Sequence, residues 1–113
     1  MKEIKAIIQP FMLAPVIDAL RELGGLPGVT VSEVQGFAKL RPADTEGEVQ
    51  TDPMGYAKKV KLEIVVAEED VERVVDVIAS KAHTGRAGDG KIFVLPVDEV
   101  VKIRTGERGP AAI

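Results

Sequence analysis

The chain contains no cysteine and no tryptophan, and among its 113 residues it has one histidine, His83, and one tyrosine, Tyr56. The absence of cysteine excludes disulfides, thiolate metal sites and cysteine nucleophiles, and it fits a reducing cytoplasm. A single histidine leaves few groups for acid–base or nucleophilic catalysis. The sequence therefore does not predict an enzyme.

Long apolar runs and an excess of positive charge are also missing. No segment approaches the ~20 apolar residues that a membrane span requires, and no signal peptide precedes the first strand-like segment. The formal net charge is −3 and the pI is near 5.2, so nucleic acid is not an expected partner. With 45% hydrophobic and 29% charged residues, the composition predicts one cytoplasmic domain over residues 1–113.

The first half of the chain predicts a strand, a helix and a second strand. Ile4 to Ile8 is an apolar segment of strand length. From Leu13 to Leu23 the apolar residues recur at three- and four-residue spacing, which is typical of an amphipathic helix, and Gly24-Gly25 ends it. Val29 to Phe37 is rich in β-branched residues and predicts the second strand.

The second half repeats this pattern. Val60 to Ala67 alternates apolar and charged residues and predicts a third strand. Val71 to Ala82 has helical spacing, although its valines have poor helix propensity. Lys91 to Val97 predicts a fourth strand, and Val100 to Arg104 a short extra one.

Two strand–helix–strand units with right-handed crossovers predict a ferredoxin-like α+β fold. Its four strands form one antiparallel sheet, and its two helices cover one face. Runs such as Ile64–Val66 and Ile92–Val94 place apolar side chains on both faces of the sheet. Because an exposed apolar face is an association liability, oligomerisation is the expected way to cover it.

Between the second and third strands lies the segment from Ala38 to Lys58, about twenty residues without clear periodicity. Loops of this length in compact domains are usually functional or disordered. The interpretations are a mobile recognition loop or an idle linker, and we favour the recognition loop.

The segment Thr84-Gly85-Arg86-Ala87-Gly88-Asp89-Gly90-Lys91 combines three glycines with two cations directly before a strand. Glycine lets backbone N–H groups approach a ligand closely, and Arg and Lys supply charge for an anion. The alternative is a plain helix-to-strand connection in which Gly85 caps the preceding helix. The segment alone leaves both interpretations open.

Taken together, the chain resembles the PII signal-transduction proteins, which act in nitrogen regulation. The resemblance covers nearly the whole chain except Ala38 to Lys58, and its most specific part is the combination of the glycine segment with Ile-Arg-Thr-Gly-Glu. The segments that carry it are Lys5–Phe11, Gly28–Phe37, Lys59–Val66, Thr84–Val94 and Ile103–Glu107.

The resemblance implies a ferredoxin-like trimer that binds ATP and ADP competitively in three clefts between subunits. It also implies three functional segments: a T-loop at about 38–58 that engages a partner protein, a B-loop at about 83–91 that wraps the phosphates, and a C-terminal segment at about 98–113.

The resemblance further implies the residues of the nucleotide site. Lys102 stands where the family usually has arginine, so a bidentate phosphate contact becomes monodentate. The phosphate ligands are Gly88, Asp89, Gly90, Lys91, Lys102 and Arg104; Ile7, Thr30 and Glu63 line the adenine pocket; Thr84, the loop base Gly36, Phe37, Ala38 and Lys39, and Lys59 complete the set.

The loop base departs from the family pattern. Leu40 replaces a glutamine that helps to hold magnesium and 2-oxoglutarate, and an apolar side chain offers no oxygen to a hard cation. This argues against both ligands, although Lys59, or Lys58 after a one-residue shift, matches the lysine that binds the oxo-acid.

The position of the family's uridylylated tyrosine also differs, because Asp52 replaces it. The chain thus resembles a divergent subgroup, some of whose members are encoded beside heavy-metal efflux pumps rather than ammonium transporters. The resemblance implies a partner protein that binds the loop 38–58, with a membrane transporter or an efflux pump among the candidates.

Three other interpretations remain beside this one. The cations could support a slow ATPase, but no residue is evident that would position water. The module could instead sense another small anion or nucleotide, such as bicarbonate or AMP. His83 could be a metal ligand, but a lone histidine in the last helical turn is more simply a favourable charge there, and we predict no metal site.

Overall fold

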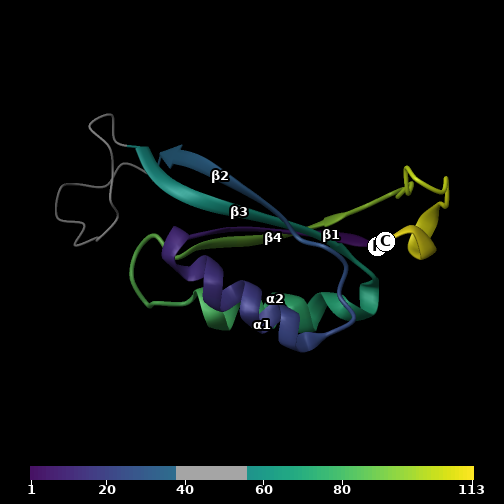
Figure 1. Ribbon diagram of the computed structural model, residues 1–113. Helices are drawn as coiled ribbons and strands as arrows, with labels where there is room; N and C mark the ends of the chain where they lie inside the picture. The colour runs from purple at the N-terminus through teal and green to yellow at the C-terminus, as the bar shows by residue number, and fades with distance from the viewer. Residues whose placement is uncertain (38–55) are drawn as a thin grey trace.

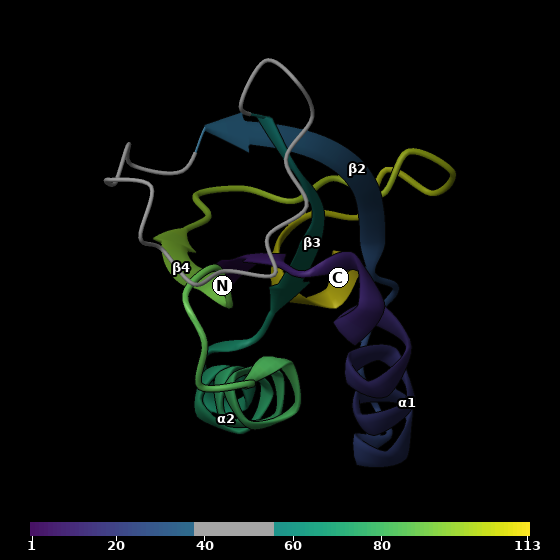
Figure 2. The ribbon, with the colours of Figure 1, turned by 90° about the vertical axis from the view of Figure 1, so that its left-hand side faces the viewer.

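A computed structural model describes residues 1–37 and 56–113 of the chain. The four strands pair antiparallel in the order β2-β3-β1-β4, and Figure 1 and Figure 2 show both helices against one face of this sheet. The predicted ferredoxin-like fold is confirmed. The elements are β1 (Lys2–Ile8), α1 (Leu13–Leu23), β2 (Thr30–Phe37), β3 (Tyr56–Val66), α2 (Val71–Ala82) and β4 (Gly90–Pro96), with short 3-10 helices at Pro10–Met12, Glu68–Asp70 and Gly109–Ala112.

The hydrophobic core lies between the helices and the two central strands. Every second side chain of β1 and β3 is buried on this side, as strand alternation requires. The apolar stripes of α1 and α2 pack against them, because both helices repeat apolar residues every three or four positions. The buried set includes Ile4, Ala6, Ile8, Val16, Leu20, Val60, Leu62, Ile64, Val66, Val74 and Ile78.

The opposite side of the sheet, here called the open face, carries the alternate residues of each strand. Charged and apolar side chains are mixed on it. Val65 is half-buried, and Phe93 is 45% exposed. The apolar runs therefore do place side chains on both faces, as predicted. Nothing among the described residues covers the open face with a helix (Figure 2).

The ribbon formed by β2 and β3 is longer than predicted. β3 begins at Tyr56, four residues before the expected start at Val60, so Tyr56 to Lys58 belong to the sheet and not to the loop. Tyr56 pairs with Phe37, and their rings lie 4.0 Å apart between centroids, so aromatic contact extends the ladder. The remainder of the predicted T-loop, residues 38–55, lies outside the described residues.

The predicted extra strand from Val100 to Arg104 is wrong. Only one isolated bridge forms there, between Val101 and Arg108. The chain folds back on itself because the Gly106 N–H donates to the Lys102 carbonyl at 2.7 Å, with Gly106 at a φ of +77°. The segment is therefore a tight local turn, here called the C-terminal turn (residues 100–109). Within the part of the chain that the structure describes, no helix is long and apolar enough to cross a membrane.

The start of β4 depends on a close backbone contact. Gly90 pairs with Ile8 and has a φ of +103°. A Cβ atom added at this position would lie 1.7 Å from the carbonyl oxygen of Ile7, which no side chain can tolerate. Gly90 therefore lets β4 approach β1 closely enough to join the sheet at this end.

We expect Gly90→Ala to lower the free energy of unfolding by about 3 kcal/mol or more, because both the backbone conformation and the space exclude a methyl group. Urea denaturation at fixed protein concentration measures this. Gly28→Ala is the matched control: nothing lies within 4 Å of its added Cβ, so the change should stay within about 0.5 kcal/mol. If the two variants lose the same free energy of unfolding, the close approach of Gly90 to the Ile7 carbonyl does not explain the effect.

Candidate functional site

The glycine segment forms a separate loop between α2 and β4. The helix ends at Ala82, and its C-cap residue is His83 in an extended conformation. The interpretation of Gly85 as a simple helix cap is therefore wrong. Gly85 and Gly88 instead take positive φ values of +87° and +95° inside the loop, which explains why glycine occurs at both positions.

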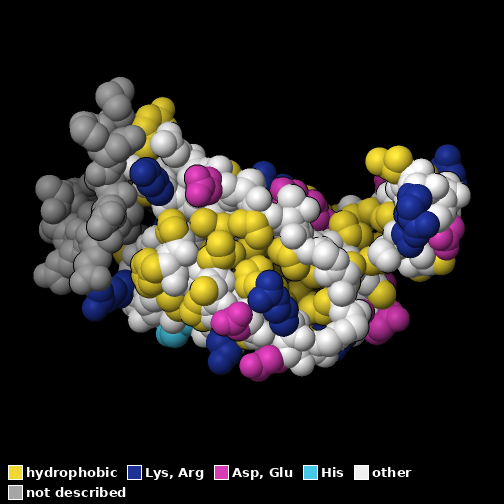
Figure 3. All heavy atoms as spheres, in the orientation of Figure 1, with side chains coloured by type: hydrophobic (Ala, Val, Ile, Leu, Met, Phe, Trp, Pro, Cys, Tyr) yellow, Lys and Arg dark blue, Asp and Glu magenta, His cyan; other side chains and the backbone are white. Residues whose placement is uncertain are grey.

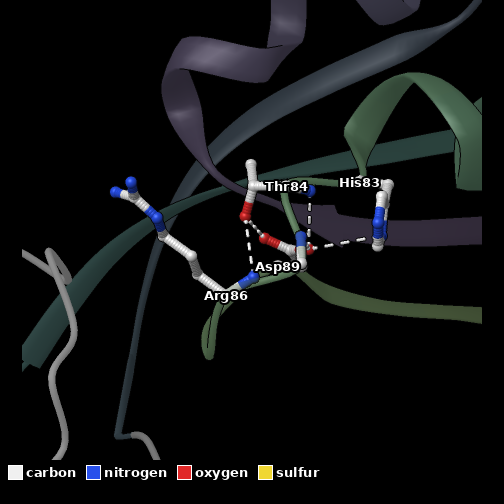
Figure 4. Close-up of polar contacts among 5 residues, drawn as sticks. His83, Thr84, Arg86 and Asp89 are labelled. Carbon is white, nitrogen blue, oxygen red and sulfur yellow. Dashed lines mark hydrogen bonds and ion pairs between the residues drawn. The ribbon is translucent and has the colours of Figure 1, made fainter.

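Asp89 holds this loop together (Figure 4). Its carboxylate accepts hydrogen bonds from the Thr84 N–H at 2.7 Å, the Gly85 N–H at 2.9 Å and the Thr84 hydroxyl. The Thr84 hydroxyl oxygen in turn accepts from the Arg86 N–H at 3.1 Å. The sequence led us to expect a phosphate ligand at Asp89, but in the structure its carboxylate closes the loop across five residues.

The electrostatics of Asp89 agree with this structural role. Partial burial raises the pKa of its carboxyl, but the hydrogen bonds from Thr84 and Gly85 and the nearby His83 outweigh burial and hold the pKa below its ordinary value. His83 Nδ1 lies 3.8 Å from the carboxylate. The single histidine therefore lies beside the carboxylate that closes the loop. Among the described residues, no group of three or more His, Cys, Asp or Glu side chains could hold a metal ion.

Lys59 connects the sheet to this loop. It lies on the open face of β3, and its ammonium donates to the Gly88 carbonyl. Burial lowers the pKa of Lys59, and the negative charge of Asp89 opposes this effect. A half-buried cation beside a glycine turn is a suitable partner for a small anion.

The structure brings most of the predicted site to one end of the sheet. Lys59 contacts the glycine loop directly, and Gly36 and Phe37 end β2 beside the start of β3. Lys91 follows Gly90 and is exposed on the open face opposite Ile7. In Figure 4 the Arg86 side chain extends away from Asp89. The residues gathered at this end are Gly36, Phe37, Lys59, Thr84, Gly88, Asp89, Gly90 and Lys91, whereas Ala38 and Lys39 lie outside the described residues.

The residues predicted to line the adenine pocket also occupy the open face. Thr30 pairs with Glu63, which pairs in turn with Lys5 across the sheet. Ile7 lies one row further toward the glycine loop, opposite both Lys61 and Lys91. The three positions therefore share a face but not a single row of the sheet.

Lys102 and Arg104 are not brought to this end. They belong to the C-terminal turn, which follows the far end of β4 and lies at the opposite end of the molecule from the glycine loop (Figure 1). The seven residues of β4 alone span roughly 23 Å. Within one chain, these two cations and Lys91 cannot hold the same phosphate chain.

The described surface has at least two grooves. One of about 390 Å³ adjoins Lys59 and is lined by Pro10, Glu33, Val34, Gln35, Lys58 and Val60. The other, of about 550 Å³, lies between α1 and β2, where Figure 3 shows apolar side chains gathered. No residue of the predicted site lines the larger groove, and its mostly apolar walls do not suit a phosphate.

Two features of the site were not predicted from the sequence. One is the role of Asp89 as an acceptor inside the loop; its spacing of five residues from Thr84 is the signal that could have indicated it. The other is Glu3, which lies on the open face diagonally across from Glu63, because β1 and β3 pair Glu3 with Val65 and Lys5 with Glu63. The charged residues at alternate positions of β1 and β3 were the signal for this placement.

Comparison with known proteins identifies relatives over the full length. A family model described as "Nitrogen regulatory protein P-II" matches residues 1–107. The chain is 48% identical over 113 residues to the nitrogen regulatory protein P-II of Azospirillum brasilense and 47% identical to that of Synechocystis sp., with 100% of both chains covered in each case. A crystal structure of Arabidopsis thaliana PII bound to citrate superposes with a TM-score of 0.79 at 44% identity, covering 99% of this chain and 91% of that one.

We expect Asp89→Asn to lower the free energy of unfolding by about 1–2 kcal/mol at pH 7, because a neutral amide accepts fewer and weaker hydrogen bonds from Thr84 and Gly85. The native carboxyl has a lowered folded pKa. Its stabilisation is therefore present above the unfolded value of about 3.9 and is lost as pH falls through the folded value. Denaturation measured from pH 7 to pH 3 should show that the difference in free energy of unfolding between the native protein and the variant becomes smaller below about pH 4.

The exposed helical residue Asp76 provides the matched control. Asp76→Asn should change stability by no more than about 0.5 kcal/mol. If the free energy of unfolding that Asp89→Asn removes stays constant across this pH range, the negative charge of Asp89 does not stabilise the loop.

Proposed function

Because the chain belongs to the P-II family of nitrogen regulatory proteins, we propose that it is a non-enzymatic signal-transduction regulator that binds ATP or ADP. The observation that carries this proposal is the glycine loop held by Asp89, with Lys59 and Lys91 beside it. The loop presents backbone at positive φ to a polyphosphate, and the two ammonium groups balance its charge.

The nucleotide clefts lie between the subunits of a homotrimer. Two independent features support this assembly. The open face carries half-buried and exposed apolar side chains without a covering helix among the described residues. Lys102 and Arg104 lie a strand's length away from the loop whose phosphates they are expected to bind, so a neighbouring chain has to supply them.

Each cleft then draws on two chains. One chain contributes the loop end of its sheet, and its neighbour contributes the C-terminal turn. The adenine contacts are Ile7, Thr30 and Glu63. The signal leaves through residues 38–55 and the ribbon that carries them, and a ligand can bias this region only by binding its alternative states with different affinity. The partner class is a membrane transporter or an efflux pump, and neither magnesium nor 2-oxoglutarate is required.

Isothermal titration calorimetry tests nucleotide binding. We expect ATP and ADP to bind at one site per chain, and Lys91→Ala to weaken binding at least tenfold, because the lysine loses a charge-assisted contact to phosphate. Lys81→Ala removes an exposed lysine from α2 and should leave the affinity unchanged. No detectable heat at millimolar ATP, with the protein folded, would refute the proposal.

A mixing experiment tests whether each cleft uses two chains. Light scattering should first give a mass three times the 12.1 kDa of one chain. Lys91→Ala and Lys102→Ala should each weaken ATP binding when assembled alone. When equal amounts are unfolded and refolded together, about a quarter of the clefts regain both lysines and should bind with native affinity.

The control is Lys91→Ala refolded with the double variant Lys91→Ala, Lys102→Ala, in which no cleft regains both lysines. If the first mixture recovers no more sites than this control, the cleft is not shared between chains.

A further inference from the structure

The groove beside Lys59 lies along the ribbon formed by β2 and β3. Figure 1 shows this ribbon bending away from the helices toward the end of β2. The groove has a volume of about 390 Å³, and Pro10, the first residue of the 3-10 helix after β1, also lines it. Its walls therefore come from two paired strands and a short helix, so the backbone around it is ordered by the fold.

Three polar side chains enter this groove from the helix side of the ribbon. Glu33 and Gln35 are alternate residues of β2, and they pair with Val60 and Lys58 of β3. Val60 is only 4% exposed and belongs to the core, so all four positions share the face that carries the helices. Glu33, Gln35 and Lys58 are exposed. The groove thus offers a carboxylate, an amide and an ammonium group on one face.

The two charges of the groove do not neutralise each other. Glu33 and Lys58 are diagonal neighbours on adjacent strands, a spacing of about 7–8 Å. No described residue forms a hydrogen bond or an ion pair with the side chain of Glu33, Gln35 or Lys58. Lys59 differs, because its ammonium donates to the Gly88 carbonyl of the glycine loop. Lys58 is therefore the cation that the groove has available for a ligand.

A carboxylate and an ammonium at this spacing favour a ligand that carries both charges. A simple anion is attracted by Lys58 but repelled by Glu33, and a simple cation meets the reverse. An α-amino acid has an ammonium and a carboxylate on the same carbon, so it is attracted at both ends. Gln35 adds an amide that can donate to the carboxylate. Pro10 and Val60 provide apolar wall for an aliphatic side chain.

We propose that this groove binds an α-amino acid with an uncharged side chain. The amino acid's ammonium donates to Glu33, and its carboxylate accepts from Lys58 and Gln35. The side chain is uncharged because both charges of the groove are then engaged. This site is separate from the proposed nucleotide site, since none of these three residues is predicted to contact the nucleotide. It gives the protein a second kind of small-molecule ligand.

The first experiment follows the backbone amides of the native protein by ¹H–¹⁵N NMR at pH 7 during titration with L-valine. We expect saturable shifts at residues 33–35 and 58–60, with one site per chain. N-acetylvaline lacks the ammonium and valinamide lacks the carboxylate, so each should bind at least tenfold more weakly. Shifts that do not saturate, or equal affinity for the three compounds, would overturn the proposal.

The second experiment exchanges the two charges. Glu33→Lys leaves two cations in the groove and Lys58→Glu leaves two anions, so each variant should bind valine at least tenfold more weakly. The double variant Glu33→Lys, Lys58→Glu again has one charge of each sign and should recover most of the affinity, with valine reversed. Glu72→Lys changes an exposed residue of α2 and should have no effect. Native affinity in either single variant would refute the assigned contacts.

Circular dichroism checks that each variant is folded. Should a charge reversal fail to fold, Glu33→Gln and Lys58→Gln carry the test, because they remove a charge without adding the opposite one. Glu33→Gln should bind valine and N-acetylvaline equally, since the group that recognises the ammonium is gone. A preference for valine that persists in this variant would overturn the role of Glu33. No nucleotide enters these titrations, so their failure leaves the proposed nucleotide site standing.

Discussion

The contact between Gly90 and the carbonyl of Ile7 is the constraint on which the site depends. It allows β4 to join β1 at the end of the sheet where the chain leaves the glycine loop. The register that follows places Lys91 opposite Ile7 on the open face and Ile92 opposite Ala6 over the core. A shift of one residue would exchange these two side chains between the faces. The glycine at position 90 therefore determines both how the edge strand β4 packs and on which face of the sheet Lys91 lies.

The regular elements of this fold were predictable because their periodicity is strong. Both helices have the predicted bounds, and the central strands alternate buried and exposed positions as their sequences do. The two wrong predictions, the start of β3 and the extra strand from Val100 to Arg104, have different causes. β3 starts at Tyr56 because β2 continues to Phe37 and offers a partner, which local sequence cannot indicate. The C-terminal turn contains β-branched residues, but Gly106 at positive φ reverses the chain before a strand can form.

The site was predictable in composition but not in arrangement. Resemblance supplied the residues, and the fold divides them between the two ends of one sheet. Asp89 illustrates the difference: in sequence it lies among residues predicted to bind phosphate, and in the structure its carboxylate accepts hydrogen bonds from Thr84 and Gly85. A carboxylate that accepts several hydrogen bonds repels a nearby phosphate less than a carboxylate without them, because the donors partly neutralise its negative charge. The loop can thus contain a carboxylate and still suit an anion through its backbone and neighbouring lysines.

The position of Lys59 relates binding to signalling in physical terms. Its backbone belongs to β3, whose first residue follows residues 38–55 in the chain, and its ammonium contacts the Gly88 carbonyl of the glycine loop. A charge-assisted hydrogen bond between these two segments has a strength that depends on what else the ammonium can bind. An anion that competes for Lys59 changes that bond, whereas a ligand that leaves Lys59 alone does not. At the proposed nucleotide site, a ligand whose phosphates reach Lys59 and a ligand whose phosphates do not would affect this bond differently. Such a difference between ligands is what linkage requires before a binding event can change a distant loop.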